Sequence, residues 1–264
     1  MTMKVGAVAN PKGGIGKSAV SVNIGHAAIE QGLKTLLVDF DKQGSLTLAY
    51  PSTVERDPAK QYIKASDLFG TPESLDGKEL EYLAPGVAII RADYDGLYRL
   101  EQAPDEFVKR PARNLRRFAE EFQVGVIDTP GVIGMTLKAA LTAADGVVCP
   151  LTLGLYDTDG LAKLWQFIGT IKKGGYNPKL RVLGMIPSRL QSRDKMAMAE
   201  LAQLRAHPTF GPMILPFNLY ERVPVARAIN LRLPVWKGAK TASHKAAGQE
   251  WKNACGHVLT SLEG

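Results

Sequence analysis

Cysteine and aromatic residues are scarce in this sequence, and long hydrophobic runs are missing from it. The two cysteines, Cys149 and Cys255, form no pair at a metal-binding spacing and suggest no disulfide framework, so a reduced cytoplasm fits them. No apolar run approaches the roughly 20 residues of a membrane-spanning helix, and the first residues lack the architecture of a signal peptide. These absences argue against a disulfide-rich secreted domain and against a helical membrane protein.

The length and the hydrophobic content are those of one large α/β domain spanning residues 1–264. Hydrophobic residues make up 45% of the 264 positions and aromatic residues only 7%, so aliphatic side chains must fill most of the core. Short apolar runs alternate with stretches of helical periodicity. Strands are expected at residues 5–9, 35–40, 87–90, 124–128, 146–150, 180–186 and 213–215. Helices are expected at residues 17–31, 97–122 with breaks near Pro104 and Pro111, 136–144, 160–173, 195–206 and 240–262.

This alternation of strands and helices predicts a doubly wound, mostly parallel sheet with helices on both faces. Residues 50–86 are irregular and rich in proline and acidic residues, so they are expected to form an excursion from the sheet rather than a second domain. The C-terminal helix, residues 240–262, has an apolar stripe in which half of the residues are small. Packing against the body of the fold explains such a stripe better than membrane targeting does.

The positive charge of the chain is concentrated in its last third. The formal net charge is +7, and residues 181–264 contain 12 Lys and Arg against 5 Asp and Glu, whereas residues 1–180 contain 21 of each. A local basic excess favours polyanions such as nucleic acid or an acidic membrane surface. A merely solvated basic face would look the same in sequence, and both interpretations remain open at this point.

A glycine-rich segment between the first strand and the first helix has the pattern of a phosphate-binding loop. Residues 12–18 are KGGIGKS. Glycines allow successive backbone N–H groups to converge on phosphate oxygens, and the start of a helix adds a partial positive charge. In this context Lys17 can reach the β- and γ-phosphates, and the Ser18 hydroxyl is placed to bind Mg²⁺. Proline at position 11, where the usual pattern has glycine, is a departure from it.

Two further segments carry acidic residues at the ends of expected strands. Residues 36–45 are LLVDFDKQGS and residues 124–131 are VGVIDTPG. A single aspartate at a strand end is usually structural, but these segments follow the glycine-rich loop in an order that suits a nucleotide site. Asp39, Asp41 and Asp128 are therefore candidates for positions near a metal ion and the phosphates.

Together these motifs resemble those of the ParA/MinD superfamily, and most closely the IncC-type plasmid members of the ParA family. KGGIGKS resembles the deviant Walker A motif, in which the first lysine, here Lys12, reaches the nucleotide of a dimer partner. The resemblance covers nearly the whole chain, although Lys42 replaces a usual proline and residues 50–120 match weakly. It implies a P-loop ATPase fold with ATP and Mg²⁺ as cofactors.

The resemblance also implies roles for individual residues. Lys12 and Asp41 are expected to be catalytic, with Asp41 positioning or activating the attacking water, while Ser18, Asp41 and Asp128 hold Mg²⁺. Thr129, Pro130 and Gly131 would form the switch that senses the γ-phosphate. The expected ATP-binding residues are Lys12, Gly13, Gly14, Ile15, Gly16, Lys17, Ser18 and Ala19 at the phosphates, and Ile186, Pro187, Pro216 and Asn218 near the adenine. Arg189, Arg222, Arg227 and Lys237 are expected to contact DNA, with Arg222 and Arg227 as the favoured pair.

The function implied by the resemblance is ATP-dependent DNA partition. ATP would bring two chains into a sandwich dimer, the dimer would bind non-specific DNA on the nucleoid, and a ParB-like protein would stimulate slow hydrolysis and release the dimer. Stable membrane association is not expected. Two alternatives remain: a MinD-like, membrane-recruited positioning ATPase, and an enzyme of the same fold, for which an iron–sulfur cluster would need cysteines in other places than Cys149 and Cys255.

Overall fold

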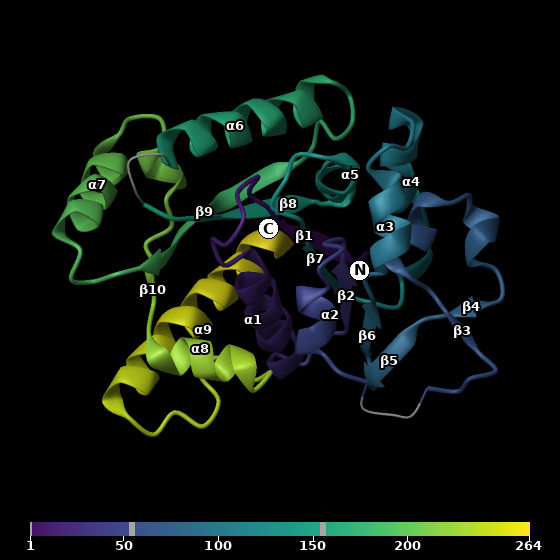
Figure 1. Ribbon diagram of the computed structural model, residues 1–264, viewed down its shortest axis with the longest axis horizontal. Helices are drawn as coiled ribbons and strands as arrows, with labels where there is room; N and C mark the ends of the chain where they lie inside the picture. The colour runs from purple at the N-terminus through teal and green to yellow at the C-terminus, as the bar shows by residue number, and fades with distance from the viewer. Residues whose placement is uncertain (1, 53–55, 154–156) are drawn as a thin grey trace.

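A computed structural model describes residues 2–52, 56–153 and 157–264, without the side chains of residues 157–161. Eight strands form one twisted sheet in the order β10-β9-β8-β1-β7-β2-β6-β5 (Figure 1). Every neighbouring pair is parallel except the edge pair of β5 and β6. The strands are β1 Lys4–Val8, β2 Thr35–Asp39, β5 Glu81–Ala84, β6 Val87–Ile90, β7 Val124–Asp128, β8 Gly146–Leu151, β9 Arg181–Leu190 and β10 Leu219–Tyr220.

Helices cover both faces of the sheet and create two apolar cores. One core lies between the sheet and α1 Lys17–Glu30, α8 Val223–Asn230 and α9 Ala242–Glu263, with the short α2 Ser45–Ala49 at its edge. The other lies under α3 Tyr94–Leu100, α4 Arg110–Leu115, α5 Met135–Ala143, α6 Asp157–Lys173 and α7 Lys195–Ala206. The central strands β2, β7 and β8 are buried along their whole length, as strands covered on both faces must be. The predicted doubly wound, mostly parallel architecture is therefore confirmed.

Some of the predicted elements differ in the structure, and proline explains two of these differences. In place of the strand expected at residues 213–215 there is a 3₁₀ turn, Gly211–Met213, and a single bridge from Ile214 to Met185. Pro212 and Pro216 flank this segment and lack the N–H donors that a ladder needs. The helix expected at 97–122 is interrupted between α3 and Pro104, and a 3₁₀ turn, Asp105–Lys109, then passes into α4 just before Pro111. Pro111 lies in the first turn of α4, where a missing N–H costs little.

The stretch 50–86 contains its own small parallel pair, β3 Gln61–Tyr62 and β4 Lys78–Glu79. Its last part is β5, which pairs with β6 and closes one edge of the main sheet. Lys64 also bridges Arg91, and the Glu81 carboxylate accepts hydrogen bonds from Arg91 Nε at 2.9 and 3.0 Å. These contacts hold the irregular stretch against the outer strands of the sheet.

The C-terminal helix α9 packs its apolar stripe inward. The stripe contacts α1, β1, β9 and β10, and its buried residues are Ala247, Gly248, Trp251, Ala254, Cys255, Val258, Leu259 and Leu262. Burial of this stripe favours the packing role predicted for it. Among the described residues, no helix combines the length and the apolar character needed to cross a membrane.

The partly buried imidazole of His26, on α1, should make the stability of the fold depend on pH. Burial lowers the pKa of His26 to about 4 from 6.5, partly offset by Glu30, and its ring packs against Tyr50 with centroids 4.8 Å apart. Between those two pH values the folded protein binds fewer protons than the unfolded chain. The contribution of His26 to the free energy of unfolding should therefore fall by about 3 kcal/mol as the pH drops from about 6.5 to about 4.

The variant His26→Phe isolates this effect, because it keeps an aromatic ring against Tyr50 and removes the titrating group. His26 Nε2 is buried and has no hydrogen-bond partner among the described residues, so no hydrogen bond of that atom is lost. Urea unfolding at a series of pH values should show a shallower loss of stability in the variant than in the wild type. Equal slopes would contradict the assignment.

Candidate nucleotide-binding site

The glycine-rich loop connects β1 to α1 and has the backbone conformation that its glycines predict. Gly14 and Gly16 have φ values of 73° and 93°, which side-chain-bearing residues rarely adopt. Gly16 is also the N-cap of α1 and, having no side chain, caps none of the first N–H groups of the helix. Lys17 follows directly, and its Nζ donates to the carbonyl oxygen of Lys12 at 2.7 Å. This local structure is suited to binding an anion.

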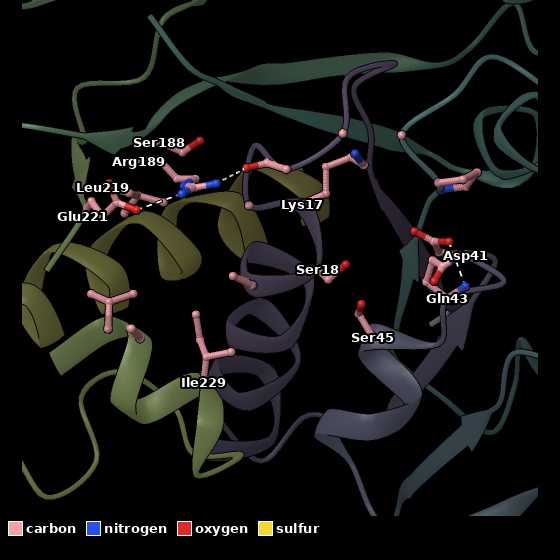
Figure 2. A pocket seen from close by; sticks show the side chains of 18 of the residues that line it. Lys17, Ser18, Asp41, Gln43, Ser45, Ser188, Arg189, Leu219, Glu221 and Ile229 are labelled. Atoms are coloured by element: carbon pink, nitrogen blue, oxygen red, sulfur yellow. Dashed lines mark hydrogen bonds and ion pairs between the residues drawn. The ribbon is translucent and has the colours of Figure 1, made fainter. Parts of the chain in front are cut away.

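The loop borders a cavity of about 780 Å³. Figure 2 shows Lys17, Ser18 and Asp41 around one end of this space, and Leu219, Glu221 and Ile229 at the other end. The cavity is thus lined by segments far apart in sequence: the loop and the start of α1, the segment after β2, the segment after β7, the end of β9, and the region from β10 through α8. A volume of this size suits a small-molecule ligand.

Two buried carboxylates stand side by side beneath the loop, because Asp39 at the end of β2 pairs in register with Asp128 at the end of β7. Burial first, and the facing Asp128 second, raise the pKa of Asp39. Burial also raises the pKa of Asp128, although the hydroxyls of Ser18 and Ser21 oppose the shift. Ser21 Oγ donates to Asp128 Oδ1 at 2.7 Å. Lys17 is the cation next to Asp128, and its own pKa is lowered by burial first.

The donor set fits a bound Mg²⁺. Asp128 Oδ2 is buried and has no hydrogen-bond partner among the described residues, so an acceptor is left over beside the loop. Across the ranges that the structure describes, no three His, Cys, Asp or Glu residues form a metal cluster. Mg²⁺ in a phosphate-loop site does not need one, because it uses one hydroxyl, one carboxylate, water and the phosphates themselves. Ser18 and Asp128 supply this minimal set.

Asp41 and Asp39 have different surroundings, although they are two residues apart. Asp41 lines the cavity, and its Oδ1 accepts from the Gln43 backbone N–H at 3.0 Å. Asp39 is fully buried and accepts from the backbone N–H groups of Asp41 at 3.1 Å and Thr47 at 2.7 Å. Asp39 therefore holds the segment between β2 and α2 and the start of α2, whereas Asp41 faces the space where a ligand would lie.

Gly131, just after β7, touches the phosphate-binding loop. A Cβ atom built on Gly131 would lie 2.9 Å from Gly13 Cα, 3.0 Å from Gly13 N and 3.2 Å from the carbonyl carbon of Lys12. Two backbone segments more than 100 residues apart in sequence thus lie in direct contact. Pro130, Gly131 and Val132 also line the cavity. A side chain added at Gly131 would therefore have to displace the loop or the segment itself.

Comparisons with known proteins agree with this geometry. A family model described as an AAA domain matches residues 3–182. Protein IncC of Escherichia coli is 33% identical to this chain over an alignment covering 99% of the chain and 70% of IncC. The chromosome-partitioning ATPase Soj of Thermus thermophilus is 29% identical, with 89% of this chain and 88% of Soj covered. The chain belongs to the ParA family of partition ATPases.

The fold of this ParA-family chain also matches solved structures. An ATP complex of a Cyanothece McdA variant superimposes with a TM-score of 0.79 at 20% identity, covering 98% of this chain and 97% of McdA. At that identity the likeness establishes the fold. The match extends over nearly the full length of both chains, so the two chains share their overall fold.

At the end of the cavity away from Lys17 and Ser18, the lining residues of this ParA-family chain are not those that sequence analysis predicted. Of the four adenine candidates, Ile186 and Pro187 are buried in β9, Pro216 is exposed, and none of the four lines the cavity. Asn218 accepts from Arg205 Nη2 at 2.8 Å through its side-chain oxygen. Their role at the adenine stays a prediction. The apolar lining comes instead from residues that sequence analysis missed, namely Leu219, Val225, Ala226, Ile229 and Trp251.

The four cationic DNA candidates of this ParA-family chain fall into two groups. Arg189 and Arg222 are engaged: Arg189 pairs with Glu221 at 2.8 Å and Arg222 with Glu250 at 2.6 Å. Arg227 and Lys237 are exposed and make no ion pair with any described residue. Arg227 lies on α8, whose opposite face packs Val225 and Ala228 against the core. Of the four candidates, Arg227 and Lys237 are therefore the two whose charges are not already paired with a described residue.

Lys12, at the start of the loop, points toward the segment that follows β8. Its Nζ lies 3.5 Å from Thr152 Oγ1. Residues 154–156, which come next in that segment, are outside the described residues. That Lys12 reaches the nucleotide of a dimer partner stays a prediction.

Proposed function

We propose that this ParA-family chain hydrolyses ATP and, as an ATP-bound dimer, binds DNA without sequence preference to segregate a plasmid or chromosome on the nucleoid. The observation that carries the proposal is one constellation around one cavity: Lys17 and Ser18 at the start of α1, Asp128 beneath them, and Gly131 against the loop. Membership of the partition ATPase family supports the same function.

Phosphoryl transfer needs positioning and charge neutralisation more than covalent chemistry. The loop N–H groups and Lys17 would bind and orient the triphosphate, and Ser18 and Asp128 would hold Mg²⁺, which neutralises charge on the phosphate oxygens. Asp41 faces the cavity with one oxygen held by the Gln43 N–H, and it would orient a water molecule. Gly131 lies against the loop and would respond to the terminal phosphate.

Exposed apolar side chains near the cavity mouth support an ATP-dependent dimer. Val132 and Ile229 line the cavity and are 59% and 41% exposed. Lys42 also lines it, and its Nζ lies 4.9 Å from the ring centroid of Tyr98, which is itself 54% exposed. Large apolar groups at the rim of a polar site are typical of surfaces that associate. A sandwich across this face would exclude water and bring Lys12 of each chain toward the partner's nucleotide.

Binding to DNA would depend on the exposed cations of α8 and the following segment. The expected result is ATP-dependent, salt-sensitive binding to arbitrary duplex DNA. Arg227→Ala should weaken binding and reduce the slope of log K against log salt by about 0.9, the contribution of one phosphate contact. Arg222→Ala should change the slope less, because its guanidinium is already paired with Glu250. Fluorescence anisotropy over a series of salt concentrations measures both.

Arg116→Ala is the matched control for this experiment. Arg116 is an exposed arginine just after α4, and α4 and α8 lie on opposite sides of the molecule (Figure 1), so its loss should leave the slope unchanged. If ATP-loaded wild-type protein ignores duplex DNA at low salt, the DNA part of the proposal is wrong. A ParB-like partner is proposed to stimulate hydrolysis, and the ATPase rate with and without that partner measures this effect.

A further inference from the structure

Two consecutive side chains at the end of β9 hold the phosphate-binding loop from the side opposite β7. Ser188 is buried, and its Oγ donates to the carbonyl oxygen of Ile15 at 2.7 Å. Arg189 Nη1 donates to the carbonyl oxygen of Gly14 (Figure 2). Both residues line the cavity. Two neighbouring loop carbonyls are thus bound by two neighbouring residues that lie far away in sequence.

The peptide plane links these contacts to phosphate binding. In a trans peptide the C=O of one residue and the N–H of the next point in opposite directions. When Arg189 holds the Gly14 carbonyl toward β9, the Ile15 N–H must point away from β9. In the same way, Ser188 holds the Ile15 carbonyl toward β9, so the Gly16 N–H must also point away from β9. The two contacts therefore set the directions of two of the N–H groups in the loop.

Arg189 also has a strained backbone that its contacts must stabilise. Its φ is 51°, in the left-handed region that costs a non-glycine residue on the order of 1 kcal/mol. Glu221, next to β10, holds the guanidinium: Arg189 Nη2 donates to Glu221 Oε1 at 2.8 Å, and Gln191 Nε2 donates to Glu221 Oε2 at 3.3 Å. The ion pair is half-exposed, so it is weak by itself and serves mainly to orient the guanidinium.

We infer that Ser188 and Arg189 are positioning residues that hold the phosphate-binding loop in its anion-binding conformation, with Glu221 orienting Arg189. This inference deepens the proposed function, because it rests on phosphate binding by the loop. It gives Arg189 a role at the nucleotide in place of the DNA contact predicted from sequence.

The test is the equilibrium affinity for Mg·ATP of single variants, measured by displacement of a fluorescent nucleotide. Ser188→Ala leaves the buried Ile15 carbonyl without its donor and should weaken binding about tenfold. Arg189→Ala and Arg189→Lys should each weaken it by about three- to tenfold, since a lysine cannot bridge Gly14 and Glu221 together. Glu221→Gln should stay within about threefold of the wild type. Arg193→Ala, an exposed arginine four residues further on, is the control and should change nothing.

Two further measurements separate positioning from other roles. The thermal midpoint of each nucleotide-free variant reports general destabilisation; a lowered midpoint with unchanged Mg·ATP affinity in Ser188→Ala and Arg189→Ala would overturn the inference. At saturating ATP, Arg189→Ala should keep the wild-type salt slope for duplex DNA. A slope smaller by about 0.9 with unchanged ATP affinity would make Arg189 a DNA contact instead. The ATP comparison needs no DNA, so failure of DNA binding in all proteins would count against the proposed function and not against this inference.

Discussion

Replacing Lys17 with alanine is expected to lower the rate constant of ATP hydrolysis by at least about 100-fold. Lys17 is almost fully buried at the start of α1, and its ammonium group already lies within the loop, bound to the Lys12 carbonyl. It is also the cation beside Asp128 and Asp41. Alanine removes the charge that would neutralise the phosphates, and no other described lysine lines the cavity except Lys42. Phosphate release at saturating Mg·ATP measures the effect.

Lys179→Ala is a suitable control for this substitution. Lys179 is an exposed lysine just before β9, at the end of the sheet away from the cavity. Its loss should leave both hydrolysis and folding unchanged. Retention of most of the hydrolytic activity by a folded Lys17→Ala protein would show that the loop does not carry the chemistry assigned to it.

A methyl group added to Gly131 is expected to have the second largest effect. The Cβ of Gly131→Ala would meet the backbone of Gly13 and Lys12, and backbone atoms cannot rotate aside as a flexible side chain can. Overpacking of this kind costs about 1–3 kcal/mol, which corresponds to a roughly 5- to 150-fold loss if the loop is displaced from its phosphate-binding conformation. Titration with Mg·ATP and steady-state hydrolysis both report on it.

The matching control is Gly169→Ala within α6. A Cβ at that position meets nothing within 4 Å, and alanine is the better helix former, so activity should be unchanged and stability equal or slightly higher. If Gly131→Ala binds and hydrolyses ATP like the wild type, the contact between the segment after β7 and the loop has no functional role.

Sequence analysis predicted the local structure of one half of the site, because short local patterns define that structure. Residues 12–19 form the loop and the start of α1, and Asp128 ends a buried strand, because a glycine-rich turn and an apolar run each determine their own local conformation. The register of β1, β2 and β7 then brings the ends of these strands together. For this half of the site, motif and topology were sufficient to predict the local structure, and the ligand roles of these residues stay predictions.

The other half depends on contacts that no local pattern reveals. β9 runs four residues past the predicted end at 186, so the chain reaches the cavity at Ser188 and Arg189 rather than at Ile186 and Pro187. β10 has only two residues, and α8 begins with Val223 and Pro224, so neither has enough periodicity to be recognised. Ser188, Arg189 and Glu221 are ordinary polar residues in sequence, and only the fold places them against the loop.

Equilibrium binding of Mg·ATP to the purified wild-type chain tests the central claim most directly. Isothermal titration should give saturable binding with one site per chain, and it should weaken strongly when a chelator removes Mg²⁺ or when Lys17 is replaced by alanine. A folded wild-type protein that takes up no Mg·ATP, even at millimolar nucleotide, would contradict the account.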